Sequence, residues 1–226
     1  MHDQHQAEPG DPTDRSHVFI VTYGRSGSTL LMSLINSAPE CIVRGENAGA
    51  LHALFEACRR IQDGQATREE TSRKTTSPWW GISEVRLDDF ARDLAEVFTR
   101  HVIRPSREHR ICGFKEIRFS PRDVPDLAGY LDFLQRAFSP AKIVFNHRRL
   151  EDVSKSKWWA GNPDALEELT AIDRRFLDFP SSDSVFHFSY DRALADRTHV
   201  RDLFTFLGAT YDDAALDEVF ATRHSY

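Results

Sequence analysis

The sequence predicts a three-layer α/β fold, in which a central parallel sheet of about five strands is flanked by helices on both faces. Two observations predict it. Short apolar runs rich in β-branched residues alternate with longer segments of helical periodicity, an order that joins parallel strands through helices. The apolar runs also lack the in-out alternation of a half-exposed strand, which indicates strands buried on both faces.

The predicted elements follow from these patterns. We expect strands where the apolar runs lie, at residues 18–23, 41–43, 111–114, 142–146 and 184–190. Apolar residues at helical spacing predict helices over 28–37, 48–61, 88–103, 124–138 and 163–179. Two more short helices, separated by Gly208, are expected near the C-terminus. The polar, threonine-rich stretch 63–83, interrupted by Pro78 and Gly81, predicts a long surface loop.

Length and composition indicate one soluble domain. A chain of 226 residues supports one full α/β domain, and its 40% hydrophobic and 28% charged residues are ordinary for a globular protein. No apolar run approaches the roughly 20 residues that span a bilayer, and residues 1–16 are polar, without the pattern of a secretory signal. We therefore expect a disordered tail over 1–16, one domain over 17–226, no membrane span and a cytoplasmic location.

Charge and cysteine content exclude other classes. The formal net charge of −6 argues against a general nucleic-acid-binding surface, although a local basic pocket can hold a small polyanion. The three cysteines are widely spaced, which fits neither a disulfide framework nor a metal knuckle, so we expect reduced and mostly buried thiols and no metal site.

A glycine-bounded turn follows the first predicted strand, in VTYGRSGSTLLMSLINS (21–37). The turn and the helix after it aim free backbone N–H groups at one point, where the helix dipole also favours an anion. The lysine of the GxxxxGK[ST] motif is absent, which disfavours kinase or ATPase chemistry, whereas Arg25 supplies a permanent cation that binds oxygens bidentately. Taken alone, an ordinary strand-to-helix turn explains the segment equally well.

A second anion-binding pattern lies in KIVFNHRRLEDVSKSKWW (142–159). It again reads as strand, basic turn and helix, with Arg148 at the strand end and Ser156 eight residues later inside the helix. Together the two residues predict a second oxyanion site. Two such motifs in this order are much more specific than either alone.

With both segments, the chain resembles the sulfotransferases that use 3′-phosphoadenosine 5′-phosphosulfate (PAPS). TYGRSGSTLL is similar to their 5′-phosphosulfate loop, in the arginine form of many carbohydrate sulfotransferases, and FNHRRLEDVSKS is similar to their 3′-phosphate segment. FHFSYDRALAD (186–196) resembles the stretch in which a tyrosine, here Tyr190, contacts the adenine. The resemblance covers about residues 17–226 and implies a P-loop NTPase-like fold.

The chain departs from the family pattern in two places. Residues 190–192 are Tyr-Asp-Arg where the family usually has Tyr-Glu-Asp, which puts the local hydrogen bonds there in doubt. The chain also stops at RHSY, whereas many members continue into a segment that closes over the 3′-phosphate. We expect Arg223 and His224 to take that part, or the site to be more open.

The resemblance implies sulfuryl transfer from PAPS to an acceptor hydroxyl, with adenosine 3′,5′-bisphosphate as the other product. Because such a transfer is analogous to phosphoryl transfer, positioning and charge stabilisation are its main tasks, and no metal is obligatory. The expected catalytic residues are Glu46, Arg25 and Lys115. The expected cofactor-binding residues are Arg25, Ser26, Gly27, Ser28, Thr29, Arg148, Ser156, Tyr190 and Arg223.

Two carboxylates are candidates for the base that activates the acceptor. Glu46 lies where related carbohydrate sulfotransferases place a catalytic glutamate, and the alternative is that it caps the helix beginning near Asn47. Glu116 also follows a strand, beside Lys115, and is a second base candidate and an acceptor contact. The alternative for Lys115 and Glu116 is a surface ion pair of little consequence.

The tryptophans form two pairs. Trp79 and Trp80 lie in the polar loop 63–83, where a place in the core is hard to explain, so we expect them to bind the acceptor and the loop to gate it. For Trp158 and Trp159 we expect plain helix packing.

We therefore predict a PAPS-dependent sulfotransferase that acts on a hydroxyl of a carbohydrate or glycoconjugate, in preference to a small phenol. An atypical P-loop kinase is the alternative within enzymology. A nucleotide-binding or interaction module that has lost catalysis is the alternative outside it.

Overall fold

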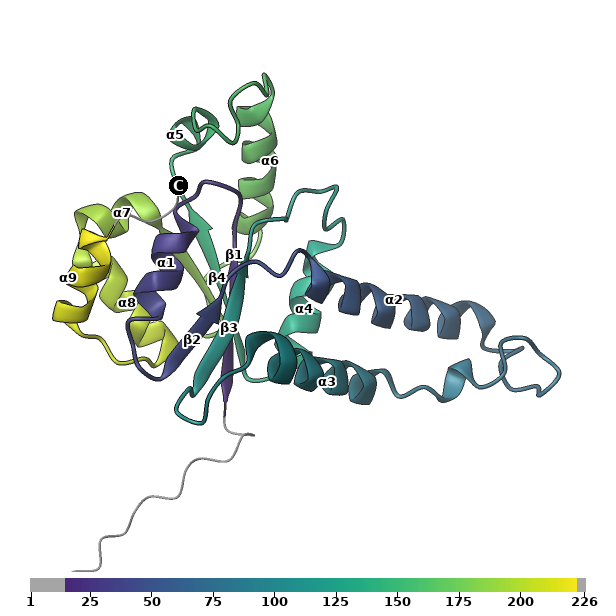
Figure 1. Ribbon diagram of the computed structural model, residues 1–226. Helices are drawn as coiled ribbons and strands as arrows, with labels where there is room; N and C mark the ends of the chain where they lie inside the picture. The colour runs from purple at the N-terminus through teal and green to yellow at the C-terminus, as the bar shows by residue number, and fades with distance from the viewer. Residues whose placement is uncertain (1–14, 223–226) are drawn as a thin grey trace, which may run out of the picture.

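The computed structural model describes residues 15–222 and has the predicted three-layer α/β fold (Figure 1). Within these residues five parallel strands form one sheet in the order β2-β3-β1-β4-β5. All five lie where the sequence predicts strands, at Ser16–Val21 (β1), Cys41–Arg44 (β2), Ile111–Glu116 (β3), Ala141–His147 (β4) and Val185–Ser189 (β5). β1 is therefore the central strand, with β3 on one side and β4 on the other.

Helices cover both faces of the sheet, and each face has its own hydrophobic core. The first core includes Phe19 and Val21 of β1 and is covered by α2 (Ala50–Arg68), α3 (Leu87–Phe98), α4 (Leu127–Ala137) and α6 (Ala165–Leu177). The second includes Val18 and Ile20 and is covered by α1 (Ser28–Ile35), α7 (Tyr190–Ala195), α8 (Arg197–Leu207) and α9 (Asp213–Ala221). Alternate side chains of β1 thus enter opposite cores, which explains why its sequence is apolar throughout.

α2 and α3 run side by side and project beyond the sheet as an arm (Figure 1). The predicted loop 63–83 is wrong at both ends, because residues 63–68 form the last turns of α2 and Ile82–Glu84 form a 3₁₀ turn, η2. Arg59 pairs with Glu56 and Asp63 along α2, and such pairs stabilise a solvated helix. A polar composition therefore did not distinguish this exposed helix from a loop.

Smaller differences concern the ends of elements. Ser16 already belongs to β1, and the Arg15 side chain donates to the His109 carbonyl at 3.0 Å, so the described domain begins before residue 17. α3 passes into a π-helical turn at Thr99–Ile103 (η3). The three cysteines are free and buried, as predicted.

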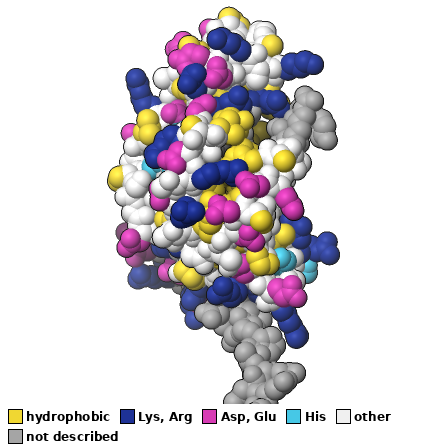
Figure 2. Space-filling model, turned by 90° about the vertical axis from the view of Figure 1, so that its left-hand side faces the viewer, with side chains coloured by type: hydrophobic (Ala, Val, Ile, Leu, Met, Phe, Trp, Pro, Cys, Tyr) yellow, Lys and Arg dark blue, Asp and Glu magenta, His cyan; other side chains and the backbone are white. Residues whose placement is uncertain are grey.

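The outer surface is mixed in charge where α8 and α9 cover the sheet. In the coloured part of Figure 2, acidic and basic side chains are interspersed, so the charges of this face largely offset one another. Within residues 15–222, no helix is both long and apolar enough to cross a membrane.

His17 of β1 makes folding sensitive to acid. Its Nδ1 lies 2.8 Å from the Phe138 carbonyl oxygen, and burial lowers the pKa of His17 to about 4. In the unfolded chain His17 therefore takes up a proton near pH 6.5, whereas in the folded chain it takes up that proton only near pH 4. We expect this group to remove about 3 kcal/mol of the free energy of unfolding as the pH falls through that window.

Urea denaturation of the wild type and of His17→Gln at pH 7 and pH 4.5 measures this effect. Stability should fall less with acidification in the variant, because glutamine does not titrate. His101→Gln, at an exposed position, is the matched control and should behave like the wild type. Equal losses in the wild type and His17→Gln would contradict the prediction.

Candidate active site

Most of the predicted site residues lie at or after the carboxyl ends of the five parallel strands, which share one edge of the sheet, whereas Trp79 and Trp80 lie in the arm. β1 and β4 are neighbours in the sheet. After β1 the chain continues to β2, which lies on the β3 side of β1, whereas β4 lies on the opposite side. In open α/β sheets such a switch point is where ligands bind. Along the edge, from β2 to β5, the strand ends lead into Glu46, Lys115 and Glu116, the loop 22–27, Arg148 and Tyr190.

The loop 22–27 joins β1 to α1 in a shape suited to an anion. Arg25 and Gly27 have positive φ angles of 70° and 81°, which is uncommon for arginine and is typical of functional turns. α1 begins at Ser28 without a side-chain cap and without an acidic residue in its first turn. The Leu30 N–H donates to the Gly27 carbonyl at 2.9 Å. The backbone N–H groups before Leu30 lie at the start of the helix, where they are placed to bind an anion.

Buried polar residues that the sequence analysis missed hold this loop. Thr22 and Asn146 are fully buried at the ends of β1 and β4, and Ser26 is buried with them. The hydroxyls of Thr22 and Ser26 share a hydrogen bond of 2.7 Å, and the Asn146 amide donates to the Ser26 carbonyl at 3.1 Å. The Ser26 side chain thus shapes the loop. Polar residues ending otherwise apolar strands were the available signal.

Arg148 connects the two predicted anion-binding segments. Its Nη1 donates to the Arg25 carbonyl at 3.1 Å, and its guanidinium carbon lies 4.6 Å from the centre of the Tyr190 ring. Tyr190 in turn covers Gly27, where an added Cβ would lie 2.2 Å from the ring. Only glycine fits at position 27. Arg25, Gly27, Arg148 and Tyr190, four predicted cofactor residues that follow β1, β4 and β5, therefore form one cluster.

Two buried donors of the predicted 3′-phosphate segment have no partner among residues 15–222. Arg148 Nε and Ser156 Oγ are both buried, and neither makes a hydrogen bond within that part of the chain, an arrangement that destabilises a protein unless a ligand or water satisfies it. The prediction that Ser156 lies inside a helix is wrong, because α5 (Leu150–Ser154) ends before it and Ser156 sits in the following turn. The Ser154 hydroxyl bonds the Glu151 carbonyl at 3.1 Å, a local bond that competes with helix continuation.

Glu46 and Lys115 form an ion pair at the same edge. Lys115 Nζ lies 2.5 Å from Glu46 Oε1, with the lysine side chain 9% exposed and the glutamate 32% exposed. Lys115 is paired in register with Ile20 of β1, which places it beside the strand that leads into the loop 22–27. Glu46 does not cap α2, because Asn47 Oδ1 accepts from the Leu51 N–H at 3.2 Å.

Glu116 also accepts a hydrogen bond from the segment at the start of α2. Its Oε2 accepts from the Gly49 N–H at 3.1 Å, and its Oε1 accepts from the Ile117 N–H at 2.9 Å and from Arg118 at 3.3 Å. The alternative of a surface Lys115–Glu116 pair is wrong, since both side chains are buried and Lys115 pairs with Glu46. The acceptor contact of Glu116 stays a prediction. Arg223 and His224 lie outside the described residues.

A sequence profile of the sulfotransferase family matches residues 17–213. This chain belongs to the sulfotransferase family. The predicted family, the P-loop-like α/β fold and the class of enzyme are thereby confirmed. Members of the family generally take the sulfuryl group from PAPS.

Two solved sulfotransferase domains agree with the fold of this chain, and a third structure is more distant. The sulfotransferase domain of the Synechococcus PCC 7002 olefin synthase is 17% identical with a TM-score of 0.53, over 92% of this chain and 78% of that one. The sulfotransferase domain from the curacin biosynthetic pathway is 11% identical with a TM-score of 0.50, over 91% and 78%. Sulfotransferase STF1 from Mycobacterium tuberculosis H37Rv is 14% identical with a TM-score of 0.45, over 92% and 71%. A search of curated proteins gives no match.

Trp158 and Trp159 of the sulfotransferase lie in turns and not in the predicted helix, whereas Trp79 and Trp80 lie outside the core as expected. Trp158 is 63% exposed outside any helix, so helix packing is wrong for it, and its ring lies 3.4 Å from the position of a Cβ on Gly24. Trp159 donates its indole N–H to the Gly24 carbonyl at 3.2 Å. Trp79 and Trp80 are exposed in the segment 69–81, at the tip of the arm (Figure 1). Their acceptor role stays a prediction.

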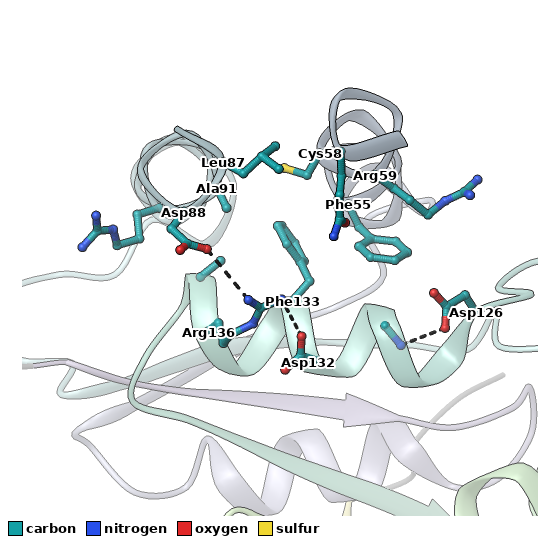
Figure 3. A pocket seen from close by; sticks show the side chains of 14 residues that line it. Phe55, Cys58, Arg59, Leu87, Asp88, Ala91, Asp126, Asp132, Phe133 and Arg136 are labelled. Atoms are coloured by element: carbon teal, nitrogen blue, oxygen red, sulfur yellow. Dashed lines mark hydrogen bonds and ion pairs between the residues drawn. The ribbon is translucent and has the colours of Figure 1, made fainter. Parts of the chain in front are cut away.

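A cavity of about 610 Å³ lies between α2, α3 and α4 (Figure 3). Phe55, Cys58 and Phe133 form its apolar wall. Arg136 forms ion pairs with Asp132 and Asp88 at its side. None of the predicted site residues lines it. This cavity is therefore separate from the predicted site at the edge of the sheet.

Proposed function

We propose that the protein transfers the sulfuryl group of PAPS to an acceptor hydroxyl, most simply that of a carbohydrate or glycoconjugate. The observations that carry the proposal are the hydrogen bond from Arg148 to the Arg25 carbonyl and two buried donors, Arg148 Nε and Ser156 Oγ, that have no hydrogen-bond partner among the described residues. One nucleotide with an anion at each end fits such a pair of adjoining sites. The arginine-type loop and a glutamate base favour the carbohydrate over a small phenol.

PAPS, when bound, supplies a sulfuryl group on a phosphate leaving group, which needs stabilisation of negative charge as the bond breaks. The N–H groups at the start of α1, the hydroxyls of Ser28 and Thr29, and Arg25 would hold this end. Arg148 and Ser156 would hold the 3′-phosphate. Tyr190, fixed over Gly27 and against Arg148, would contact the adenine.

The Glu46–Lys115 pair would act on the acceptor side. Glu46 is the more exposed member and can accept the proton of an acceptor hydroxyl. Lys115 orients it and offers a cation to the transferring oxygens. Glu116 has both oxygens occupied by donors of its own chain, so we assign it the positioning of the segment before α2 instead of the proton transfer.

Binding of adenosine 3′,5′-bisphosphate tests the donor assignment. We expect calorimetry without magnesium to show micromolar or tighter binding of the bisphosphate and no comparable binding of ATP. Tight, magnesium-dependent binding of ATP would instead favour the kinase alternative. Bisphosphate binding without sulfate transfer to a broad panel of carbohydrate and phenolic acceptors would favour the inactive module.

Trp158 is the exposed aromatic side chain beside the donor loop, and we infer that it contacts the acceptor. Aromatic rings bind the apolar faces of sugars, and removing one such contact weakens binding by about 1–2 kcal/mol. We therefore expect Trp158→Ala to raise the acceptor KM about tenfold and to leave the bisphosphate Kd within about twofold of the wild type. Trp80→Ala, at the tip of the arm, tests in the same assay the acceptor role that the sequence predicts for Trp79 and Trp80. An unchanged KM in Trp158→Ala would contradict the assignment.

A further inference from the structure

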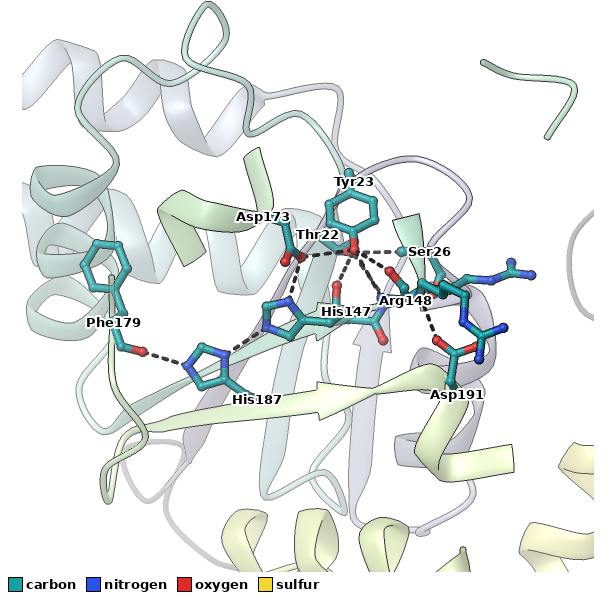
Figure 4. Close-up of polar contacts among 11 residues, drawn as sticks. Thr22, Tyr23, Ser26, His147, Arg148, Asp173, Phe179, His187 and Asp191 are labelled. Carbon is teal, nitrogen blue, oxygen red and sulfur yellow. Dashed lines mark hydrogen bonds and ion pairs between the residues drawn. The ribbon is translucent and has the colours of Figure 1, made fainter. Parts of the chain in front are cut away.

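A row of three short hydrogen bonds runs from α6 across β4 to β5, next to Arg148 (Figure 4). His147 Nδ1 lies 2.7 Å from Asp173 Oδ1, and His147 Nε2 lies 2.8 Å from His187 Nδ1. His187 Nε2 then lies 2.6 Å from the Phe179 carbonyl oxygen. Two imidazole rings thus fill the space between a carboxylate and a backbone carbonyl.

The row fixes the number of protons that it holds. Each of the three contacts needs one proton, since a carboxylate and a carbonyl only accept and two bare nitrogens would repel each other. Two neutral imidazoles carry one N–H proton each, and therefore only two between them. The third proton makes one of the two rings an imidazolium.

The extra charge belongs on His147. Its Nδ1 faces Asp173, and imidazole is more basic than a carboxylate, so the proton between them sits on nitrogen. Asp173 Oδ1 also lies 3.1 Å from the Tyr23 hydroxyl, which can donate to it as well. Burial lowers the pKa of His187, and the neighbouring His147 lowers it further, so His187 is the neutral ring.

Asp173 connects this row to the donor site through Tyr23, which belongs to the loop 22–27. The Tyr23 hydroxyl accepts from the Arg148 N–H at 3.1 Å and faces the Arg148 carbonyl at 3.2 Å. Burial raises the pKa of Tyr23, so the hydroxyl stays neutral. Asp191 of α7 holds the next N–H, that of Arg149, at 2.7 Å.

We propose that the His147–His187 pair holds one proton more than two neutral rings and, through Asp173 and Tyr23, positions Arg148 for the 3′-phosphate. The proton count stands on the contacts alone, whereas the coupling to the donor rests on the function proposed above. The extra proton is lost from the pair at alkaline pH. One contact in the row then fails, and donor affinity falls.

Histidine NMR tests the proton count directly. In ¹⁵N-histidine-labelled protein, with signals assigned by His147→Gln and His187→Gln, one ring should carry protons on both nitrogens at pH 7.5. The other should be neutral with its proton on Nε2. Two neutral rings at pH 7.5 would overturn the proposal.

Asp173→Asn is the matched variant for the coupling. The asparagine amide can donate to His147 Nδ1, so two neutral rings then satisfy all three contacts, while Tyr23 donates to the Arg148 carbonyl. From pH 7 to pH 9.5 we expect the bisphosphate Kd to rise about fivefold in the wild type, the size of one lost hydrogen bond, and to stay flat in the variant. The ligand titrates identically in both, so the ratio of the two Kd values isolates the protein.

Parallel pH profiles for the wild type and Asp173→Asn would overturn the coupling. His101→Gln, which changes an exposed histidine, should keep the wild-type profile. If neither protein binds the bisphosphate at any pH, the donor assignment fails and the coupling falls with it. The histidine spectrum decides the proton count in that case too.

Discussion

Arg148→Ala should weaken binding of adenosine 3′,5′-bisphosphate about 100-fold, the largest loss of affinity that we expect from a single substitution. The guanidinium serves twice. Its buried Nε makes no hydrogen bond within residues 15–222 and would donate to the 3′-phosphate, and its Nη1 holds the Arg25 carbonyl at 3.1 Å. Alanine removes a charge-assisted contact to the ligand and the bond that sets the adjoining loop.

Arg149→Ala is the control for this prediction. Arg149 is next in sequence, has the same charge, and has a side chain that is 67% exposed, so its removal should change the Kd less than about threefold. Thermal unfolding of both variants checks that each is folded. Equal affinities for Arg148→Ala and the wild type would remove the 3′-phosphate from this part of the molecule, and with it the proposed orientation of the donor.

The sequence contained enough to bring the residues of the proposed donor site to one edge of the sheet, because its two motifs follow strands. Once the chain reads as parallel strands joined by helices, the segments after residues 21 and 147 end at one edge of a sheet. What the sequence could not state is that β1 and β4 are adjacent. That adjacency brings the Arg148 side chain onto the Arg25 carbonyl, 123 residues away.

The residues that support the site had no such signal. Asp173 lies in the middle of α6 among charged residues that otherwise look like a solvated helix face, and His187 reads as one polar position in an apolar strand. Their roles depend on α6 and β5 both meeting β4 at His147, which is tertiary packing and not local pattern. The last turns of α2, residues 63–68, were predicted as a loop for a related reason, since a helix stabilised by surface ion pairs has the composition of a loop.

The contacts of Glu46 separate the two glutamates that the sequence left as rival bases. Glu46 pairs with Lys115 and is partly exposed, whereas Glu116 is buried and accepts from two backbone N–H groups. A proton acceptor must be reachable by the substrate. A carboxylate occupied by its own backbone instead holds the chain in place.

Glu46→Gln should therefore lower kcat by a factor of about 10² to 10⁴, the usual contribution of a general base, with the bisphosphate Kd unchanged. Glutamine keeps the shape of the side chain and an oxygen for Lys115, but it does not accept the proton of the hydroxyl. Glu116→Gln is the matched comparison. The glutamine amide would set its own N–H donor against one of the backbone N–H donors that Glu116 now accepts from. The variant should therefore lose about 1–3 kcal/mol of the free energy of unfolding and keep most of kcat in the folded fraction. Steady-state kinetics beside urea denaturation distinguishes the two, and the reverse pattern would make Glu116 the base and Glu46 a structural partner of Lys115.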